Sequence, residues 1–166
     1  MKAILVILAC GLLVGCVSSG GKAIPESRKE AYLDKAACVS TYGLLLEFGP
    51  ARACPLIVQA LDRYSSDDDQ SIRRRVEILN ALYHVPVERN WRPYTQVVRR
   101  ALSDRSPEAR LYLAGFIATR FPERDALRYL RPMLKDPDAS VRERVQEAID
   151  GMAKSGTNNM IEGIEP

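Results

Sequence analysis

One nine-residue stretch decides the fold of this chain: Leu134-Lys135-Asp136-Pro137-Asp138-Ala139-Ser140-Val141-Arg142. Aspartate and proline in its middle favour a tight turn, because proline fixes its own φ and aspartate side chains bond to backbone groups that follow. Apolar residues recur at helical spacing on both sides of the stretch. We therefore predict a helix, a short turn and a second amphipathic helix that opens near Val141.

The same pattern occurs twice more along the chain. Leu102-Ser103-Asp104 precedes Ala109-Arg110, and in both copies the leucine stands eight positions before the arginine. An earlier copy places Leu61 before Ile72-Arg73, with four extra residues in the acidic loop 65–70. The three arginines are therefore 37 and 32 residues apart, which is a spacing typical of helical solenoids. One helical hairpin cannot bury its apolar face alone, so we expect the hairpins to stack and share a core.

This turn-and-helix pattern resembles HEAT and HEAT-like repeats over about residues 54–153. The resemblance implies an all-α fold, namely a short right-handed α-solenoid of helical hairpins with about seven helices. In these repeats the turn aspartate and the helix-start arginine often bond along the stack. The alternative is that each charged residue is only a helix cap or a solvated charge. The residues expected in such a structural ladder are Arg73, Asp104, Arg110, Asp136 and Arg142.

Helix signals divide the rest of the chain. A Ser27-x-x-Glu30 capping box predicts a first helix that begins near Arg28, and Gly49-Pro50 should stop it. Ser106-Pro107 marks another start, and a proline inside the helix 125–135, Pro132, should bend or restart it. The helices expected after the first are 54–64, 71–84, 91–103, 107–120, 125–135 and 139–153. The predicted repeat domain is 27–153, followed by a disordered tail over 154–166.

The start of the chain has the pattern of a secretory signal. Met1-Lys2 supplies a positive charge, and the apolar run 3–14 follows it. As a helix that run is about 18 Å long, too short to cross a hydrocarbon core of about 30 Å. We therefore expect an address that is removed rather than a lasting membrane span.

Leu13-Val14-Gly15-Cys16 resembles the bacterial lipobox, and Ile7-Leu8-Ala9-Cys10 is a weaker second match. The resemblance implies that 1–15 is a signal peptide, that Cys16 is lipidated, and that 16–26 contain the lipidated cysteine and a flexible tether. No aspartate follows Cys16, which by the same resemblance implies sorting to the outer membrane, facing the periplasm. The alternative is an ordinary secretory signal in which Cys16 is incidental.

Cys38 and Cys54 would remain besides the lipidated cysteine, and the periplasm permits disulfides. If the first helix ran unbroken to Glu47, Cys38 would lie about 14 Å from its end, whereas a disulfide needs Cα atoms within about 7 Å. Two alternatives follow. Either the pair stays reduced, or the helix breaks near 39–43 and a disulfide forms.

Composition excludes several classes of function. The net charge of +3 falls to +2 once Lys2 is removed, so nucleic-acid binding is not indicated. His84 is the single histidine and fits a helix end better than a metal or catalytic site. The run 67–69 of three aspartates lacks the glycine and distal glutamate of a calcium loop. We expect no enzyme activity, no metal and no cofactor apart from the lipid on Cys16.

These features together predict a membrane-anchored, non-enzymatic adaptor or assembly scaffold that binds an unidentified protein of the bacterial cell envelope. One rival is an envelope structural protein that binds peptidoglycan or lipopolysaccharide through arginine. Another is a HEAT-like enzyme or small-ligand protein with an arginine-lined pocket, which would bring together several of Arg99, Arg100, Arg110 and Arg128. Most of the aromatic residues in the helices should pack in the core or between repeats, and an exposed subset would anchor a protein partner; the set is Trp91, Tyr94, Tyr112, Phe116, Phe121 and Tyr129.

Overall fold

The structure, a computed structural model, describes residues 23–84 and 91–161, with side chains up to Lys154. This part of the chain is all-α, as the sequence predicted, with eight α-helices and one 3-10 helix and no strand. The first four helices are α1 (Glu26–Lys35), α2 (Cys38–Phe48), α3 (Pro50–Arg63) and α4 (Asp69–His84). The 3-10 helix Arg92–Tyr94 then precedes α5 (Thr95–Leu102), α6 (Pro107–Arg120), α7 (Glu123–Met133) and α8 (Ala139–Ile161).

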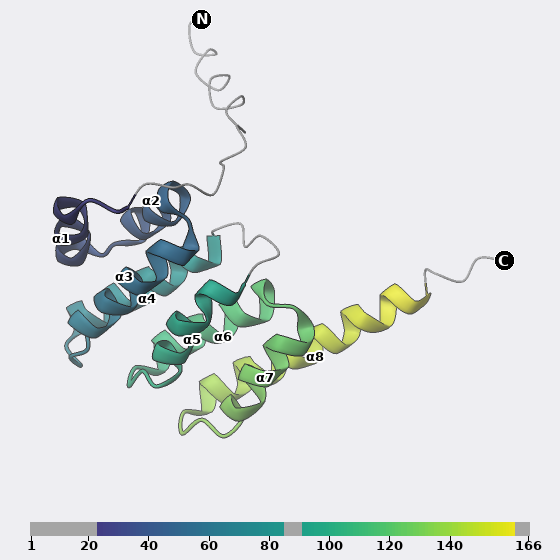
Figure 1. Ribbon diagram of the computed structural model, residues 1–166. Coiled ribbons are helices and arrows are strands. Elements are labelled where there is room, and N and C mark those ends of the chain that lie inside the picture. The colour runs from purple at the N-terminus through teal and green to yellow at the C-terminus, as the bar shows by residue number, and fades with distance from the viewer. Residues whose placement is uncertain (1–22, 85–90, 162–166) are drawn as a thin grey trace, which may run out of the picture.

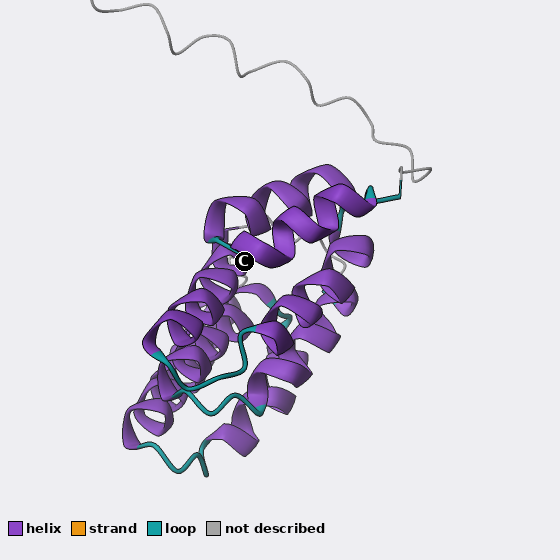
Figure 2. Ribbon diagram, turned by 90° about the vertical axis from the view of Figure 1, so that its left-hand side faces the viewer, coloured by secondary structure: helices purple, strands orange, loops and turns teal. Residues whose placement is uncertain are grey.

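The helices form two layers (Figures 1 and 2). In the even layer, α2, α4, α6 and α8 each contact the next. In the odd layer, α1 contacts α3 and α3 contacts α5, but among the described residues α5 and α7 do not touch. Each even helix also contacts the odd helix that precedes it in the chain. The chain is thus a row of helical hairpins, packed more continuously along the even layer.

The core runs between the two layers and is built from residues at helical spacing. On α4, Ile78, Leu79 and Leu82 are fully buried, and on α6 Leu113, Phe116 and Ile117 are fully buried. Aromatic rings extend this core. Phe116 on α6 stands edge-on to Tyr94 of the 3-10 helix and to Phe121, which follows α6. Each helix therefore buries one stripe against its neighbours, as expected for amphipathic helices.

The local signals explain most helix ends. Gly49 closes α2 with φ of 73°, a backbone conformation that glycine adopts without strain, and Pro50 then opens α3 at its first position. The Ser106 hydroxyl accepts a hydrogen bond from the amide of Ala109 at 3.3 Å and caps α6. The predicted stop at Gly49-Pro50 and the predicted start at Ser106-Pro107 are both confirmed.

The first helical segment differs from the prediction. It is two helices that meet at Ala36–Ala37, so there are eight α-helices where about seven were expected. The break brings the Tyr32 hydroxyl within 3.0 Å of Thr41 Oγ1, although residues nine positions apart lie about 13 Å apart along an unbroken helix. The expected break at 39–43 is wrong, because those residues lie inside α2.

Three further boundaries differ. Ser27 is not a cap: α1 begins at Glu26 after Pro25, and no side chain caps it. Pro132 neither bends nor restarts a long helix, because α7 ends one residue later. α8 continues to Ile161, so the first eight residues of the expected tail 154–166 are helical. The remaining residues of that tail lie outside the described part of the chain, as do the signal 1–15 and the lipidation site Cys16.

Candidate functional site: an arginine ladder and an open groove

Arg110 joins two successive interhelical turns. Its Nη1 donates to the carbonyl oxygens of Asp104 at 2.6 Å and Arg105 at 3.0 Å, in the turn before α6. Its Nε and Nη2 donate to the two carboxylate oxygens of Asp136, each at 2.7 Å, in the turn before α8. This two-point contact gives both distance and direction to the bond. One side chain therefore fixes the α5–α6 turn against the α7–α8 turn.

Arg75 makes the equivalent contacts one hairpin earlier. Its Nη1 donates to the carbonyl oxygens of Tyr64 and Ser66 in the turn before α4. Its Nε lies 2.8 Å from Asp104 Oδ2, close enough for an ion pair but not aligned as a hydrogen bond. Both side chains are almost fully buried, at 1% and 2% exposure. A buried pair of this kind is strongly destabilised when one partner is removed.

Arg142 repeats half of the arrangement. Its Nη1 donates to the carbonyl oxygens of Asp136 at 2.7 Å and Pro137 at 3.0 Å. We call the set Arg75, Asp104, Arg110, Asp136 and Arg142 the arginine ladder. Four of its five members were predicted, and the structure brings them together. Arg73 was the wrong choice, because it is exposed on α4 while Arg75 occupies the ladder position.

The ladder also shifts the ionisation of its members. The hydrogen bond to Asp136 raises the pKa of Arg110, against the opposing effect of burial. Burial on its own would raise the pKa of Asp136, but the bonds from Arg110 and from the Asp138 amide outweigh it and hold that pKa below its usual value. Both shifts favour the charged form, so each partner stabilises the charge on the other in the Arg110–Asp136 pair.

A polar hollow of about 480 Å³ lies beside the ladder. It is the place where the arginine-lined pocket of the small-ligand hypothesis could lie. Arg75, Arg100 and Arg105 line it together with Asp104. Each of these arginines faces a carboxylate: Arg75 pairs with Asp104, Arg100 with Asp62 and Arg105 with Asp67. The positive charge is therefore neutralised locally. The four arginines proposed for a pocket do not converge either, since Arg99 and Arg128 are exposed on α5 and α7 while Arg110 is engaged in the ladder.

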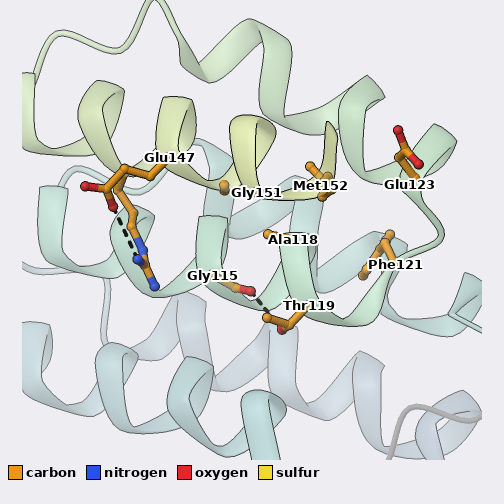
Figure 3. A pocket seen from close by; sticks show the side chains of 10 residues that line it. Gly115, Ala118, Thr119, Phe121, Glu123, Glu147, Gly151 and Met152 are labelled. Carbon is orange, nitrogen blue, oxygen red and sulfur yellow. Dashed lines mark hydrogen bonds and ion pairs between the residues drawn. The ribbon is translucent and has the colours of Figure 1, made fainter. Parts of the chain in front are cut away.

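A second hollow, of about 580 Å³, opens between α6 and α8 (Figure 3). Small residues form much of its wall: Gly115 and Ala118 on α6, and Ala148 and Gly151 on α8. Figure 3 shows Phe121 and Glu123 at one end and Glu147 at the other. Because the wall residues are small, the two helices leave room for an apolar side chain from another molecule.

This hollow continues into a third one, of about 320 Å³, between α4, α6 and α8. The two hollows share Gly115 and Arg144, and we call them together the Gly115 groove. A Cβ atom at Gly115 would lie 3.8 Å from Tyr83 Cε2 and 3.9 Å from Arg144 Nη2. A methyl group would therefore fit here with ordinary contacts, whereas a larger side chain would reach into the junction. The α4 side is lined by Asn80, Tyr83 and His84, and α6 adds Leu111 and the exposed Tyr112.

Several polar groups in and beside the groove are engaged in contacts within the chain. Arg120 fixes Tyr83 by donating to its carbonyl oxygen from Nε at 3.1 Å, with the guanidinium 5.7 Å from the ring centre. The Thr119 hydroxyl donates to the Gly115 carbonyl oxygen at 2.9 Å, so its proton is not directed at a base. Arg144 makes only a loose 3.5 Å pair with Glu147. An apolar floor with charged and aromatic edges is typical of a surface that binds polypeptide.

Sequence reasoning missed most of this groove. Tyr112 was named as a partner-binding candidate among the aromatic residues, and at 40% exposure it is the most accessible large apolar side chain outside α2 in the described residues. Gly115 and Arg144 were not singled out. The signal that could have found the groove is Gly115 itself. A glycine in the middle of a helix, where alanine would be more stable, often has a packing or functional reason.

Cys38 and Cys54 are free thiols, so of the two alternatives left open by the sequence the structure has the reduced pair. Cys54 is fully buried in α3, and burial raises the pKa of its thiol to about 12. Cys38 opens α2 and is half-buried.

The remaining observations concern ligands and membranes. Within the described ranges, no three histidine, cysteine or acidic side chains gather in a way that could hold a metal ion. His84 is the last residue of α4. No helix between Ala23 and Ile161 is both long and apolar enough to cross a membrane.

Comparison of the chain with models of protein families, with curated proteins and with solved structures finds no match.

Proposed function

We propose that this chain is a lipid-anchored, non-enzymatic adaptor of the bacterial cell envelope, and that a protein partner binds in the Gly115 groove. The observation that carries the proposal is the groove itself: two adjoining hollows along the even layer that share Gly115 and Arg144. Small residues leave space for a partner's apolar side chains, while Tyr112 and Arg144 at the edge offer an aromatic ring and a charge, which are common in binding hot spots.

The body that presents the groove is, in this proposal, a short HEAT-like solenoid. Two features support it: the row of hairpins in two layers, and an arginine that fixes each turn to the next at the same place in successive hairpins. Repeat stacks of this kind offer an extended surface on one layer for binding. The groove lies on the even layer, whose helices contact one another without interruption.

The anchor in this proposal is Cys16, supported by the lipobox-like Leu13-Val14-Gly15-Cys16. Outer-membrane attachment facing the periplasm would place the groove among envelope proteins. Intact mass and membrane fractionation of the wild type and Cys16→Ala test this part. We expect the lipid mass and the membrane association to disappear together in the variant; unchanged mass and location would contradict the anchor.

The groove is tested by photo-crosslinking in intact cells. A photoreactive amino acid at Tyr112 should capture a discrete protein, whereas the same residue at Arg99, exposed on α5 in the opposite layer, should not. Adding Gly115→Leu to the Tyr112 variant fills the junction and should abolish the capture, while Gly115→Ala should retain most of it. Equal capture from both positions, or capture that survives Gly115→Leu in a folded protein, would contradict the groove as the binding site.

A further inference from the structure

α2 exposes an apolar face that its place in the fold does not explain. Of the three large apolar side chains exposed among the described residues, two lie on α2: Val39 at 83% exposure and Leu46 at 58%. They are seven positions apart, and with Gly43 between them they form one face of the helix. The opposite face holds Thr41, Leu44 and Leu45, which are buried against the rest of the molecule.

This face lies at the end of the row of hairpins. In Figure 1, α1 and α2 stand together at the N-terminal end of the stack, and α2 packs on α3 and α4. The terminal unit of a repeat stack normally carries a polar outer face, because no further unit covers it. The exposed residues of α1 follow that rule, since they are charged or polar except for Ala31. The outer face of α2 does not follow it.

The chain itself limits what can cover this face. The described residues begin at Ala23, and Ile24 is already packed into the core. Ala23 is only seven positions after Cys16, a stretch of chain that even fully extended spans at most about 25 Å. If Cys16 carries the lipid, the α1–α2 end is held within that distance of the bilayer, whereas the α7–α8 end is not.

The chemistry of the face favours lipid over protein as its occupant. Valine and leucine are under-represented among the hot spots of protein interfaces. Tyr42, which shares this side of the helix, is half-buried and packs against the core, so Val39 and Leu46 supply the exposed apolar surface. The polar groups at its rim are occupied within the chain: Glu47 pairs with Arg28 at 2.6 Å, and the Ser40 hydroxyl donates to the Ala37 carbonyl oxygen at 2.7 Å. Two aliphatic side chains without unsatisfied polar neighbours suit the acyl-chain boundary of a membrane.

We propose that the Val39–Gly43–Leu46 face of α2 rests on the lipid bilayer that holds Cys16, and so sets the orientation of the whole stack on the membrane. This inference rests on the lipid anchor of the proposed function. The contact is weak by itself, but the tether makes it intramolecular, so a small affinity is enough to keep the face on the membrane. The groove, on α4, α6 and α8, is then presented away from the bilayer at a fixed height.

The test uses the lipidated full-length protein in vesicles of phosphatidylethanolamine and phosphatidylglycerol with brominated acyl chains. Trp91 is replaced by phenylalanine, and a single new indole is introduced by Leu46→Trp or, as the matched control, by Arg99→Trp on α5. We expect bromine to quench the fluorescence of Leu46→Trp severalfold more strongly than that of Arg99→Trp. Equal, weak quenching of the two variants would overturn the inference.

Separate measurements distinguish the possible failures. Intact mass and co-flotation with the vesicles are checked first, because a protein without lipid would contradict the proposed function rather than the orientation. The oligomeric state of Cys16→Ala is then compared with that of the same protein carrying Val39→Asp and Leu46→Asp. A dimer that these two changes dissolve would assign the face to a second copy and overturn the membrane contact, whereas a monomer in both supports it. Circular dichroism checks that these exposed substitutions leave the fold intact.

Discussion

At the scale of single residues, Arg75 shows how a buried charge becomes structural. Arginine is normally excluded from cores, yet Arg75 is 1% exposed because its guanidinium meets Asp104 and two turn carbonyl oxygens. The sequence offered three consecutive arginines, 73–75, and the insertion in the loop 65–70 obscured the choice. The apolar positions of α4 decide it: Ile78, Leu79 and Leu82 stand three, four and seven residues after Arg75, just as Leu113, Ala114 and Ile117 stand after Arg110.

Replacement of Arg75 should therefore be far more costly than replacement of its neighbour. Arg75→Ala leaves Asp104 buried without its main counter-charge, so we expect the free energy of unfolding to fall by about 3 kcal/mol or more. Arg73→Ala, two residues away on the exposed side of the same helix, should change it by less than about 0.5 kcal/mol. Urea unfolding followed by circular dichroism measures both. Similar losses in the two variants would mean that the ladder position is misassigned.

Tyr32 gives a prediction at alkaline pH. Burial is the main cause that raises the pKa of its hydroxyl to about 12, whereas the unfolded chain ionises near the ordinary value of about 10. Between these values the unfolded state binds fewer protons than the folded state, so stability is complete below about pH 10 and falls as the pH rises toward 12. The slope corresponds to about 1 kcal/mol between pH 10 and 11.

Unfolding of wild type and Tyr32→Phe in urea at a series of pH values isolates this effect. The substitution should cost about 1 kcal/mol at neutral pH, because Thr41 loses its partner, and the difference between the two proteins should shrink above pH 10. Comparison of the two proteins cancels the contribution of Cys54, which ionises in the same range. A difference that stays constant up to pH 12 would contradict the assignment of the shift to Tyr32.

The thiols make a second residue-scale test. Under denaturing, non-reducing conditions we expect two reactive thiols from Cys38 and Cys54, because neither is engaged in a disulfide. In the folded protein Cys38 should react with a thiol reagent well before Cys54, since Cys54 is fully buried and its raised pKa suppresses the thiolate. Mass spectrometry after timed alkylation separates the two sites. A protein lighter by the mass of two hydrogen atoms, with neither thiol reactive, would show that Cys38 and Cys54 form a disulfide.

At the scale of helices, the sequence predicts well wherever a boundary has a strong local cause. The segment 107–120 was predicted with both ends correct, because Ser106 caps it and Pro107 opens it. The split at Ala36–Ala37 could not be predicted, because two alanines favour a helix and the Tyr32–Thr41 bond across the break has no sequence signal. Tertiary contacts overrode local propensity there.

Gly115 is the helix-scale position where stability and binding are separable. Glycine inside a helix is less stable than alanine by roughly 1 kcal/mol, and the Cβ of alanine would meet only ordinary contacts at 3.8 and 3.9 Å. Gly115→Ala should therefore raise the free energy of unfolding by about 0.5 to 1 kcal/mol. Gly151→Ala on α8, where no atom lies within 4 Å of the new Cβ, is the matched control for helix propensity alone. A marked loss of stability in Gly115→Ala would show that there is no room for a methyl group at this position, and so would contradict the open groove.

At the scale of the whole molecule, contacts connect neighbours only. α1 touches α2 and α3, while α6 touches α4, α5, α7 and α8. The sequence pattern carried part of this order, because the Leu-to-Arg spacing of eight occurs in two hairpins and a longer version occurs in the one before them. The sequence pattern did not predict the groove. The groove depends on how closely α6 and α8 approach each other, and therefore on the volumes of side chains that are far apart in the chain.

A molecule connected in this way should come apart locally rather than all at once, because in the described part of the chain each hairpin is held only by its neighbours. Asp136→Ala removes the contact by which Arg110 holds the α7–α8 turn, where both side chains are less than 9% exposed. We expect hydrogen exchange to become faster in α7 and α8, and less so in α6, while α1 to α3 keep their protection.

Hydrogen exchange with mass spectrometry follows each helix separately, and Asp34→Ala is the matched control because it breaks the exposed Arg63–Asp34 pair. Such surface pairs contribute little, so that variant should leave the exchange pattern almost unchanged. If Asp136→Ala instead accelerated exchange equally in every helix, the chain would unfold as one cooperative unit. A shared core between the two layers would then outweigh the ladder, and the description of the molecule as a stack of hairpins joined turn to turn would be wrong.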